Sequence, residues 1–235
     1  MNDVLQNLIK LDQELLLSMN GSDSLFWDGI MVVITSTQVW IPMFIVLLYV
    51  IGKNNTLRSF MWTIAAIALV ILLSDQISSG ICKPLFERFR PTQDPYLMYE
   101  VDIVNGYRGG RYGFISSHAA NTFGAFVFLS LIFRRKSIAI ILGVWAVMSS
   151  YSRIYLGVHY LGDILCGCLV GCLTGYLMYI LYLRLNKEKT NVYQAYSKSS
   201  VYTRTGYSVS DLNLLLLTIL LTYSLIPFIG MIIVA

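Results

Sequence analysis

The feature that most constrains this chain is a series of long apolar segments separated by short polar ones. About 20 consecutive apolar residues are enough for a helix to cross the hydrocarbon core of a bilayer. Six segments approach or exceed this length: residues 29–51, 59–82, 116–133, 137–152, 160–184 and 212–234. Only 13% of the residues are charged, against about 25% in an ordinary soluble domain. We therefore predict an all-α fold: a polytopic helical membrane bundle of about six transmembrane helices that forms a single domain over residues 1–235.

The basic residues indicate which side of the membrane each connecting segment faces. Residues 52–58, 134–136 and 184–211 together hold ten of the 17 lysine and arginine residues and only two acidic ones. Cytoplasmic loops are enriched in lysine and arginine, and all three segments fall on the same side of a six-helix arrangement. We therefore expect a multi-pass protein of the cytoplasmic (inner) membrane, in which both termini, residues 83–115 and residues 153–160 face the periplasm or outside.

The N-terminal 26 residues follow a different pattern. Their apolar residues recur at helical spacing, at Val4, Leu5, Leu8, Ile9, Leu11, Leu15 and Leu16. They lack the basic region and continuous apolar core that are typical of a cleaved signal peptide. Amphipathic helices of this kind lie in the membrane interface. We therefore expect an N-terminal interfacial helix on the outer leaflet, rather than a seventh span.

Two polar segments interrupt the apolar ones. Residues 92–114 contain a Gly-Gly pair, many charges and several tyrosines, and we expect them to form a folded outer cap loop, since long irregular loops in compact proteins are usually functional or disordered. Residues 185–211 are rich in Ser, Thr, Lys and Tyr. They are predicted to form a cytoplasmic connector, to which we assign no chemistry.

Small residues mark the segment 160–184 as a packing helix. Gly167, Gly171 and Gly175 recur at a spacing of four, which permits close backbone approach between helices in lipid. We therefore place this helix at the centre of the bundle. The cysteines are interpreted as packing residues, because free cysteine behaves as a small apolar residue and no metal-ligand pattern surrounds Cys82, Cys166, Cys168 and Cys172.

Ionisable residues begin this same helix, in the stretch "SRIYLGVHYLGD". Residues four apart on a helix share a face, so the Asp163 carboxylate can accept a hydrogen bond from one ring nitrogen of His159. This leaves the other nitrogen with a free lone pair, as a nucleophile requires. A His–Asp pair that only stabilises the helix is the alternative interpretation of these two residues alone.

Cations lie on the same predicted outer face. Arg153 precedes His159 by six residues, and "KPLFERFRP" supplies Lys83 and Arg90. Arg88 falls one residue away from the helical face that Lys83 and Arg90 would share. Arginine matches phosphate oxygens in two-point contact and lysine acts as a compact point charge, so these cations predict a site for a multiply charged anion. Taken singly, each cation could instead extend its charge to the lipid headgroups.

The stretch "FISSHAAN" adds a third element. Ser116 and Ser117 stand where a helix is expected to begin, since serine is a favoured N-cap residue. The free N–H groups of a helix N-terminus bind anions. His118 follows directly, in a position to protonate a leaving oxygen.

These three stretches, in this order, resemble the signature of the type 2 phosphatidic acid phosphatase superfamily, which includes bacterial lipid phosphatases, undecaprenyl diphosphate phosphatases and lipid A phosphatases. The first motif is matched by Lys83, Arg90 and Pro91, and the third by Ser152, Arg153, His159 and Asp163. The second is usually Pro-Ser-Gly-His and reads Ile115-Ser116-Ser117-His118 here. The resemblance covers about residues 60–185.

The resemblance implies an enzyme that works without a metal or other cofactor, through a phosphohistidine. His159 would attack phosphorus, Asp163 would orient it, and His118 would protonate the leaving oxygen. The remaining motif residues would hold the phosphate oxygens: Lys83, Arg90, Ser116, Ser117 and Arg153. We therefore predict a membrane phosphatase that acts on a lipid-borne phosphate, with the lipid bilayer and a lipid phosphate as partners and no nucleic acid.

Several alternatives stay open at this point. Undecaprenyl diphosphate and lipid A are the favoured substrates, with phosphatidate and phosphatidylglycerophosphate as further candidates. Arg108 and Arg111 would contact a second phosphate or a sugar headgroup, or else lie in a solvated turn. Asp75, an acid within the second apolar segment, is interpreted as bonded to Ser or Gln on a neighbouring helix and not as part of the site. A lipid transporter or flippase that binds phosphate without cleaving it is the alternative function, and a vanadate-dependent haloperoxidase is a third.

Overall fold

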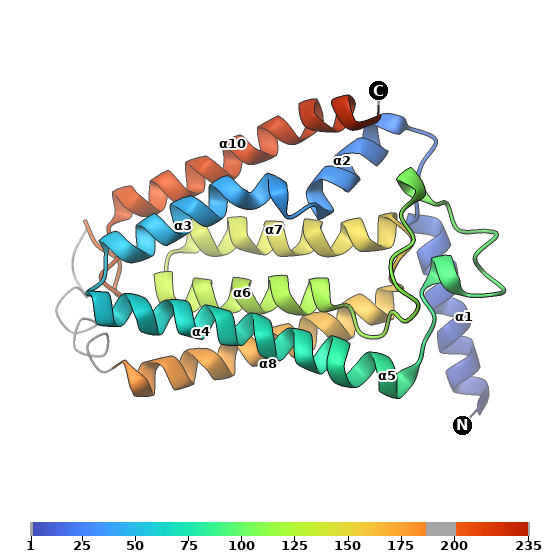
Figure 1. The fold of residues 1–235 in the computed structure, drawn as a ribbon, viewed down its shortest axis with the longest axis horizontal. Helices are drawn as coiled ribbons and strands as arrows, with labels where there is room; N and C mark the ends of the chain where they lie inside the picture. Colours follow the sequence, from blue (N-terminus) through green and yellow to red (C-terminus); the bar gives the residue numbers. More distant parts are fainter. Residues whose placement is uncertain (1, 187–200, 235) are drawn as a thin grey trace.

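The computed structural model describes residues 2–186 and 201–234. The predicted all-α class is confirmed: the described residues form helices joined by loops, with two isolated bridges in place of a sheet. The principal helices are α1 (Asn2–Met19), α2 (Leu25–Thr35), α3 (Ile41–Lys53), α4 (Leu57–Asp75), α6 (Ser117–Phe133), α7 (Lys136–Tyr155), α8 (Leu161–Leu185) and α10 (Val209–Val234). Helices α3 to α10 run along the long axis of the molecule (Figure 1).

The apolar segments account for the lengths of these helices. Four helical stretches are long and apolar enough to cross a membrane: Leu57–Phe86, Lys136–Tyr155, Leu161–Leu185 and Val209–Ile233. Helix α6 is also apolar but shorter. The chain is therefore a multi-pass integral membrane protein with four candidate spans, or five if the bent pair described next counts as one.

The segment 29–51, predicted as one helix, is instead broken. Helix α2 ends at Thr35, and the chain resumes through a short 3₁₀ turn into α3, with a bend of 65° between the two parts. Pro42 stands in the first turn of α3, a position where its missing N–H costs no intrahelical hydrogen bond. The break brings the end of α2 against the outer end of α7, which matters for the site.

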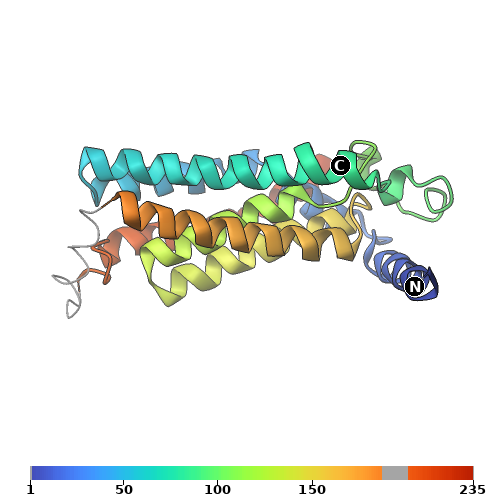
Figure 2. The ribbon, with the colours of Figure 1, turned by 90° about the horizontal axis from the view of Figure 1, so that it is seen from below.

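Helix α4 continues past its own end through the π-helical stretch Gln76–Cys82 into α5 (Lys83–Phe86). This single line of helix is seen along its length in Figure 2. It stops at Glu87, whose φ of 47° is left-handed. The helix that carries Lys83 therefore ends before Arg90, which is extended, and the helical face that we expected Lys83 and Arg90 to share does not exist.

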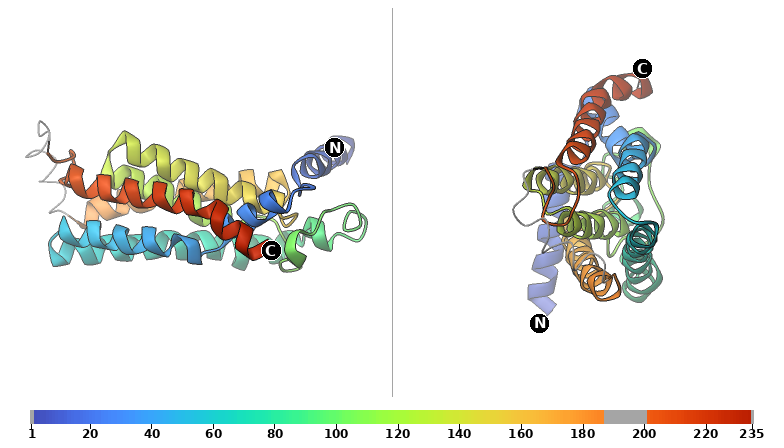
Figure 3. Two further views of the ribbon diagram at one scale, coloured as in Figure 1. Left: turned by 90° about the horizontal axis from the view of Figure 1, so that it is seen from above. Right: turned by 90° about the vertical axis from the view of Figure 1, so that its left-hand side faces the viewer.

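The glycines of α8 do mediate close packing, as predicted, but α8 is not at the centre of the bundle. A Cβ on Gly167 would lie 2.5 Å from the Ser116 carbonyl oxygen, and one on Gly171 would lie 2.3 Å from that of Ala120. Helix α6 is the central element, since it contacts α4, α7 and α8, whereas α8 lies at the edge when the bundle is seen end-on (Figure 3). A glycine stripe reports one close contact, which an edge helix can also make.

The two ends of the bundle differ in their connections. Residues 54–56 and 134–135 turn at one end, where the described part of the predicted connector also lies; residues 187–200 of that connector fall outside the described residues, and α10 begins at Val209, before the predicted end of the connector. The loop 87–116 and the turn 156–160 lie at the other end, together with both termini (Figure 1). Helix α1 runs across this second end and contacts α7 and α8.

Candidate active site

His159 and Asp163 contact each other at the loop-bearing end of the bundle. The His159 ring Nδ1 lies 3.3 Å from Asp163 Oδ2, and both side chains are buried. Asp163 Oδ2 also accepts a hydrogen bond from the backbone N–H of Tyr160, at 3.1 Å. A carboxylate held in this way favours the tautomer in which Nδ1 carries the proton.

The predicted contact therefore forms, but for a different reason. Helix α8 begins at Leu161, so His159 precedes the helix and Asp163 is its third residue. Asp163 reaches back to the N-terminal turn as the acidic residue of a capping box does. The spacing of four brings the two side chains together through a helix cap, and not because both lie on one helical face.

Arg90 occupies the other side of the imidazole. Its Nη1 lies 3.0 Å from His159 Nε2 and donates to the carbonyl oxygen of Val158 at 3.0 Å. Burial lowers the pKa of His159 well below its usual value, and the charges of Arg90, Arg153 and Lys83 lower that pKa further. His159 is therefore a neutral imidazole with its Nε2 lone pair directed at a guanidinium.

Lys83 joins the first motif to the second. Its ammonium donates to the hydroxyl of Ser117 at 3.0 Å and to that of Ser79 at 2.8 Å. Ser79 in turn donates to Asp75 Oδ1 at 3.2 Å. The expected partner of Asp75 is thus a serine, but it lies one turn along the same helical line and not on a neighbouring helix.

Arg153 ends helix α7 and is buried. Its guanidinium donates to Thr35 Oγ1 at 2.8 Å and to the Tyr107 hydroxyl at 3.1 Å, and it lies 5.2 Å from the centre of the Tyr107 ring. Thr35 stands at the break between α2 and α3. Neither Thr35 nor Tyr107 was found by sequence reasoning, because nothing in their local pattern connects them to Arg153.

The predicted helix start at Ser116 is confirmed. Ser116 is the N-cap of α6, and its hydroxyl accepts from the backbone N–H of Ala119 at 3.4 Å. The Ser116 N–H donates to the backbone carbonyl of Asp163 at 3.0 Å, which ties the beginning of α6 to the beginning of α8. His118 lies in the first turn of α6. It is close enough to His159 for a positive charge on its ring to lower the pKa of His159.

Glycines let the outer loop close over Arg90. A Cβ on Gly113 would lie 3.1 Å from both Arg90 Cγ and Asp163 Oδ2, and one on Gly109 would lie 3.3 Å from the Arg90 guanidinium. Gly109 also has a φ of 67°, which favours glycine. The Gly-Gly pair was the sequence signal for a turn, but it did not show what the turn covers.

Arg108 and Arg111 lie on the exposed part of this loop and point to different partners. Arg108 donates to the backbone carbonyl of Thr92 at 3.1 Å. The Arg111 guanidinium lies over the rings of Phe89 and Tyr112, at 5.2 and 5.3 Å. The structure thus places both at the rim and not among the buried cations.

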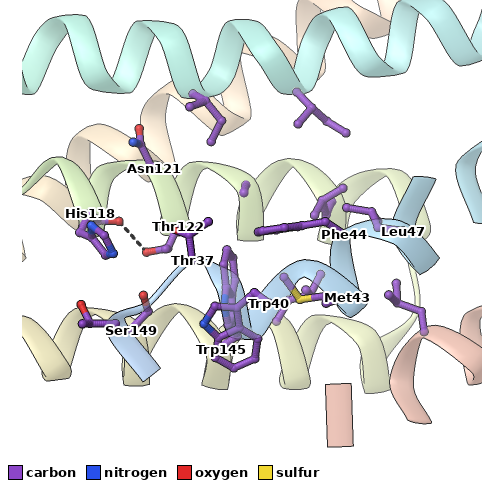
Figure 4. A pocket seen from close by; sticks show the side chains of 17 residues that line it. Thr37, Trp40, Met43, Phe44, Leu47, His118, Asn121, Thr122, Trp145 and Ser149 are labelled. Atoms are coloured by element: carbon purple, nitrogen blue, oxygen red, sulfur yellow. Dashed lines mark hydrogen bonds between the residues drawn. The ribbon is translucent and has the colours of Figure 1, made fainter. Parts of the chain in front are cut away.

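A cavity of about 390 Å³ begins at the site and extends into the apolar bundle. Its polar end is lined by Thr35, His118, Asn121 and Ser149, and its apolar end by residues such as Phe44 and Leu47. Figure 4 shows His118 at one end and Leu47 at the other. The cavity therefore connects a polar end, which includes His118, to a hydrocarbon-like interior.

The arrangement is suited to holding a phosphate beside a nucleophile. Three motif cations act on one buried, neutral imidazole, and the Nε atoms of Arg90 and Arg153 have no hydrogen-bond partner among the described residues. Within the same described part of the chain, no group of three His, Cys, Asp or Glu side chains could hold a metal ion. Fixed cations of this kind stabilise the charge that develops on phosphoryl oxygens.

The fold is that of an integral membrane protein, and one end of its helical bundle holds a buried imidazole surrounded by cations. The chain belongs to the PAP2 superfamily, whose model matches residues 64–187. The resemblance inferred from the three motifs is thereby confirmed, and the chain is a membrane lipid phosphatase.

The chain is also similar in sequence to three named lipid phosphatases. A lipid A 4′-phosphatase of Bacteroides thetaiotaomicron is 40% identical over 179 residues, which cover 76% of this chain and 80% of that protein. A lipid A 4′-phosphatase of Porphyromonas gingivalis is 36% identical over 181 residues, 76% of each chain. The phosphatidylglycerophosphatase B of Bacillus subtilis is 29% identical over 141 residues, 56% of this chain and 64% of that one.

A solved structure shares the fold. The transmembrane PAP2-type phosphatidylglycerolphosphate phosphatase of Bacillus subtilis superposes with a TM-score of 0.55 at 19% identity. The superposition covers 79% of this chain and 87% of that one. At this identity the likeness supports the helical architecture alone.

Proposed function

We propose that this protein removes the 4′-phosphate of lipid A, or of a closely similar phosphorylated glycolipid, at the outer face of the cytoplasmic membrane. The observation that carries the proposal is the neutral His159, whose Nε2 faces Arg90 while its Nδ1 is held by Asp163. The names of the two relatives above 30% identity select lipid A among lipid phosphates.

The first chemical step follows from this geometry. His159 Nε2 attacks phosphorus, and the bond between phosphorus and the sugar oxygen breaks. His118 is neutral in the free site, because burial and the charges of Arg153, Arg90 and Lys83 oppose its protonation. The negative charge of the bound phosphate offsets those cations, so His118 takes up a proton when the lipid binds and gives it to the leaving oxygen. The products are the dephosphorylated lipid and a phosphohistidine. Asp163 stabilises the positive charge that His159 acquires as its Nε2 forms the new bond.

The second step releases phosphate. A water attacks the phosphohistidine while His118, now neutral, accepts a proton from that water. The P–N bond breaks, and inorganic phosphate leaves with neutral His159 restored. Both steps pass through a transition state with charge on the equatorial oxygens, which Lys83, Arg90 and Arg153 are placed to stabilise.

The cavity beside His118 supplies a seat for part of the lipid. Its mouth is at the site and its far end is apolar, so a hydrocarbon chain can enter it while the phosphate stays among the cations. A chain that enters the cavity leaves the hydrocarbon of the bilayer for apolar side chains, so its burial adds little affinity and mainly fixes the position of the lipid. The remaining chains of a multiply acylated lipid would stay in the bilayer.

The membrane arrangement completes the proposal. All six predicted apolar segments are helical, with the first broken and the third short, so we propose six membrane crossings in one phosphatase domain. Helix α1 lies across the site end with exposed Leu5, Leu8 and Leu11, as an interfacial helix would. The basic connections at the opposite end then face the cytoplasm, and the site faces the periplasm.

The headgroup contacts are proposed at the rim of the loop 92–114. Arg108 and Arg111 are exposed there, where they can contact the sugar or the second phosphate of a bisphosphorylated glycolipid. Phosphatidylglycerophosphate is the second candidate substrate, favoured by the Bacillus subtilis relative and the fold that it shares.

Phosphate release by the detergent-purified protein tests the proposal. Lipid A, undecaprenyl diphosphate, phosphatidylglycerophosphate and phosphatidate would each be offered with EDTA present. We expect release from lipid A to be the fastest, with mass spectrometry locating the loss at the 4′-position. His159→Ala should lower the rate by on the order of 10⁴–10⁶, as removal of a catalytic nucleophile does.

Two controls separate the parts of the proposal. Protein quenched in alkaline denaturant should carry a phosphoryl group that is stable to base and lost in acid in the wild type, and none in His159→Ala. Preference for another lipid would overturn the substrate and keep the mechanism. Full activity of a well-folded His159→Ala would overturn the mechanism.

A further inference from the structure

Arg88 connects the proposed catalytic dyad to helix α1. Its Nη1 donates to Asp163 Oδ1 at 2.9 Å, and its Nη2 donates to Asp12 Oδ2 at 2.8 Å. The guanidinium also lies 4.0 Å from the centre of the Tyr160 ring. Arg88 is outside the three family motifs, and its partners come from segments 75 residues or more away in sequence.

Asp12 uses its second oxygen to cap helix α8. Asp12 Oδ1 accepts from the backbone N–H of Gly162 at 2.9 Å. A Cβ at Gly162 would lie 2.8 Å from Asp12 Oδ2, so a glycine allows this close approach. A carboxylate at a helix N-terminus stabilises the helix through its free N–H groups, and this helix carries Asp163.

The oxygens of Asp163 are thus divided between two tasks. Oδ2 faces His159 and the Tyr160 N–H, while Oδ1 is held by Arg88. Asp163 is fully buried, whereas Arg88 and Asp12 keep 26% and 15% of their side-chain surface exposed. A buried carboxylate needs a paired charge to remain ionised, and Arg88 provides it from the side opposite His159.

We infer that Arg88 and Asp12 are positioning residues for the hydrolytic reaction, and that helix α1 through them holds Asp163 in the orientation that His159 needs. The inference rests on the proposed function, since it takes the His159–Asp163 dyad as the reacting machinery. Neither Arg88 nor Asp12 contacts the imidazole. Their effect is therefore on turnover and not on lipid binding.

The position of α1 gives the contact a physical consequence. Leu16 of α1 is buried against the bundle, while Leu5, Leu8 and Leu11 are exposed on it. When this amphipathic helix docks onto the bundle, it brings Asp12 to Arg88. The same contact therefore completes the row of paired charges Asp12–Arg88–Asp163. An α1 that is displaced takes Asp12 away from both Arg88 and the Gly162 N–H, so the Arg88 side chain that holds Asp163 is no longer fixed from its other side.

Asp12→Asn is the first test, with Glu14→Gln as the matched control. Both replace a carboxylate by an amide on α1, but Glu14 is 62% exposed and, among residues 2–186 and 201–234, forms an ion pair with Lys10 alone, at 3.8 Å. We expect Asp12→Asn to lower kcat about 10-fold to 100-fold, the effect of losing a charge-assisted hydrogen bond, with KM for the lipid unchanged. Glu14→Gln should leave both constants unchanged.

A double-mutant cycle distinguishes positioning from simple loss of stability. In an Arg88→Ala background, Asp12→Asn should cause no further loss of kcat, because Asn keeps an oxygen for the Gly162 N–H and the other route to Asp163, through Arg88, is already cut. Two independent structural defects would instead multiply. Arg88→Lys should recover only part of the activity, since one ammonium does not present the two-point fork that joins both carboxylates.

The outcomes separate this inference from the proposed function. An active, well-folded His159→Ala would overturn the proposed mechanism and this inference with it. An inactive His159→Ala together with an Asp12→Asn that equals Glu14→Gln would overturn this inference alone. A higher KM with unchanged kcat in Asp12→Asn would also overturn it, because that result would place Asp12 at the lipid.

Discussion

The two ends of the helical bundle use similar polar residues in opposite ways. At the end that carries the loops 54–56 and 134–135, Lys53 pairs with Asp211 at 2.8 Å, and Asn54 donates to the same carboxylate at 2.9 Å. Asn186 donates to Ser59 at 2.8 Å. Each of these contacts joins two helices or their connections, and the charges balance within the pair.

The cluster of side chains around His159 has a surplus of positive charge, although the segments that form this end of the bundle hold more acidic than basic residues. Lys83, Arg90 and Arg153 act on His159, whereas the one carboxylate in the dyad, Asp163, is already paired with Arg88. A protein that needed only structural pairs would place a carboxylate against each buried cation. The difference teaches that charged residues alone do not mark a site for an anionic ligand. Such a site is marked by buried cations that outnumber the carboxylates beside them.

Removal of one surplus cation should have the largest effect. Arg153→Gln keeps a hydrogen-bond donor beside Thr35 and Tyr107 but removes the positive charge. We expect kcat/KM to fall on the order of 10²–10³, as for other groups that stabilise transition-state charge. The rate of phosphate release from lipid A, with monodisperse protein, measures this loss. A loss of less than about tenfold would show that Arg153 mainly ties α7 to α2.

The pH profile should reveal the charge of Arg90 on His159. Neutral His159 is the reactive form, so activity is lost as pH falls through its pKa. Burial and Arg90 lower the pKa of His159, and the wild type should therefore remain active below pH 6.5. In Arg90→Gln the pKa of His159 rises, and the acid limb of kcat/KM should therefore move to higher pH. An unmoved limb would mean that His159 is not the titrating group.

A substitution that narrows the cavity should weaken the binding of the lipid. Ala125 lines the cavity, and Ala125→Phe should fill part of the space while leaving the cations in place. We expect KM for a long-chain lipid phosphate to rise about tenfold, because the chain would have to displace packed side chains in the narrowed cavity, at a cost of about 1–3 kcal/mol. The rate with a short, soluble phosphate ester should not change. Ile140→Phe on the exposed face of α7 (67% exposed) is the control.

The sequence predicted the helical class and the separation of basic loops from the site because both depend on composition. Apolar length alone marks each helix. It did not predict the break at Thr35, since a proline in the first turn of a helix is compatible with either a new helix or a continuing one. It also misplaced α8, because small residues report a close contact and not how many neighbours a helix has.

The contact between His159 and Asp163 was predicted from the spacing of the motif, and it forms for a reason that the sequence did not show. His159 precedes its helix, and Arg90 lies beyond the end of α5 in extended chain. The residues that sequence reasoning missed, such as Tyr107 and Asp12, act through contacts between distant segments. Such contacts leave no periodic pattern, so only the fold reveals them.

Asp75→Asn should have a smaller effect, because it acts on the site through two hydrogen bonds. Asp75 accepts from Ser79, which accepts from Lys83. We expect kcat to fall about threefold to tenfold, in line with the net contribution of one hydrogen bond. Ser79→Ala should give a loss of similar size, and the double variant should be no worse than either. Losses that multiply would show that Asp75 acts by another route.

Lys53→Gln should change activity least, although it too removes one positive charge and breaks a 2.8 Å ion pair with Asp211. Lys53 is 53% exposed, so water already screens its charge, and the pair joins α3 to α10 far from His159. We expect kcat/KM to stay within about twofold of the wild type, since exposed ion pairs contribute little. Thermal unfolding in detergent would show a slight loss of stability. If Lys53→Gln instead impaired turnover as much as Arg153→Gln, net charge on the protein, and not its unbalanced concentration around His159, would be what catalysis requires.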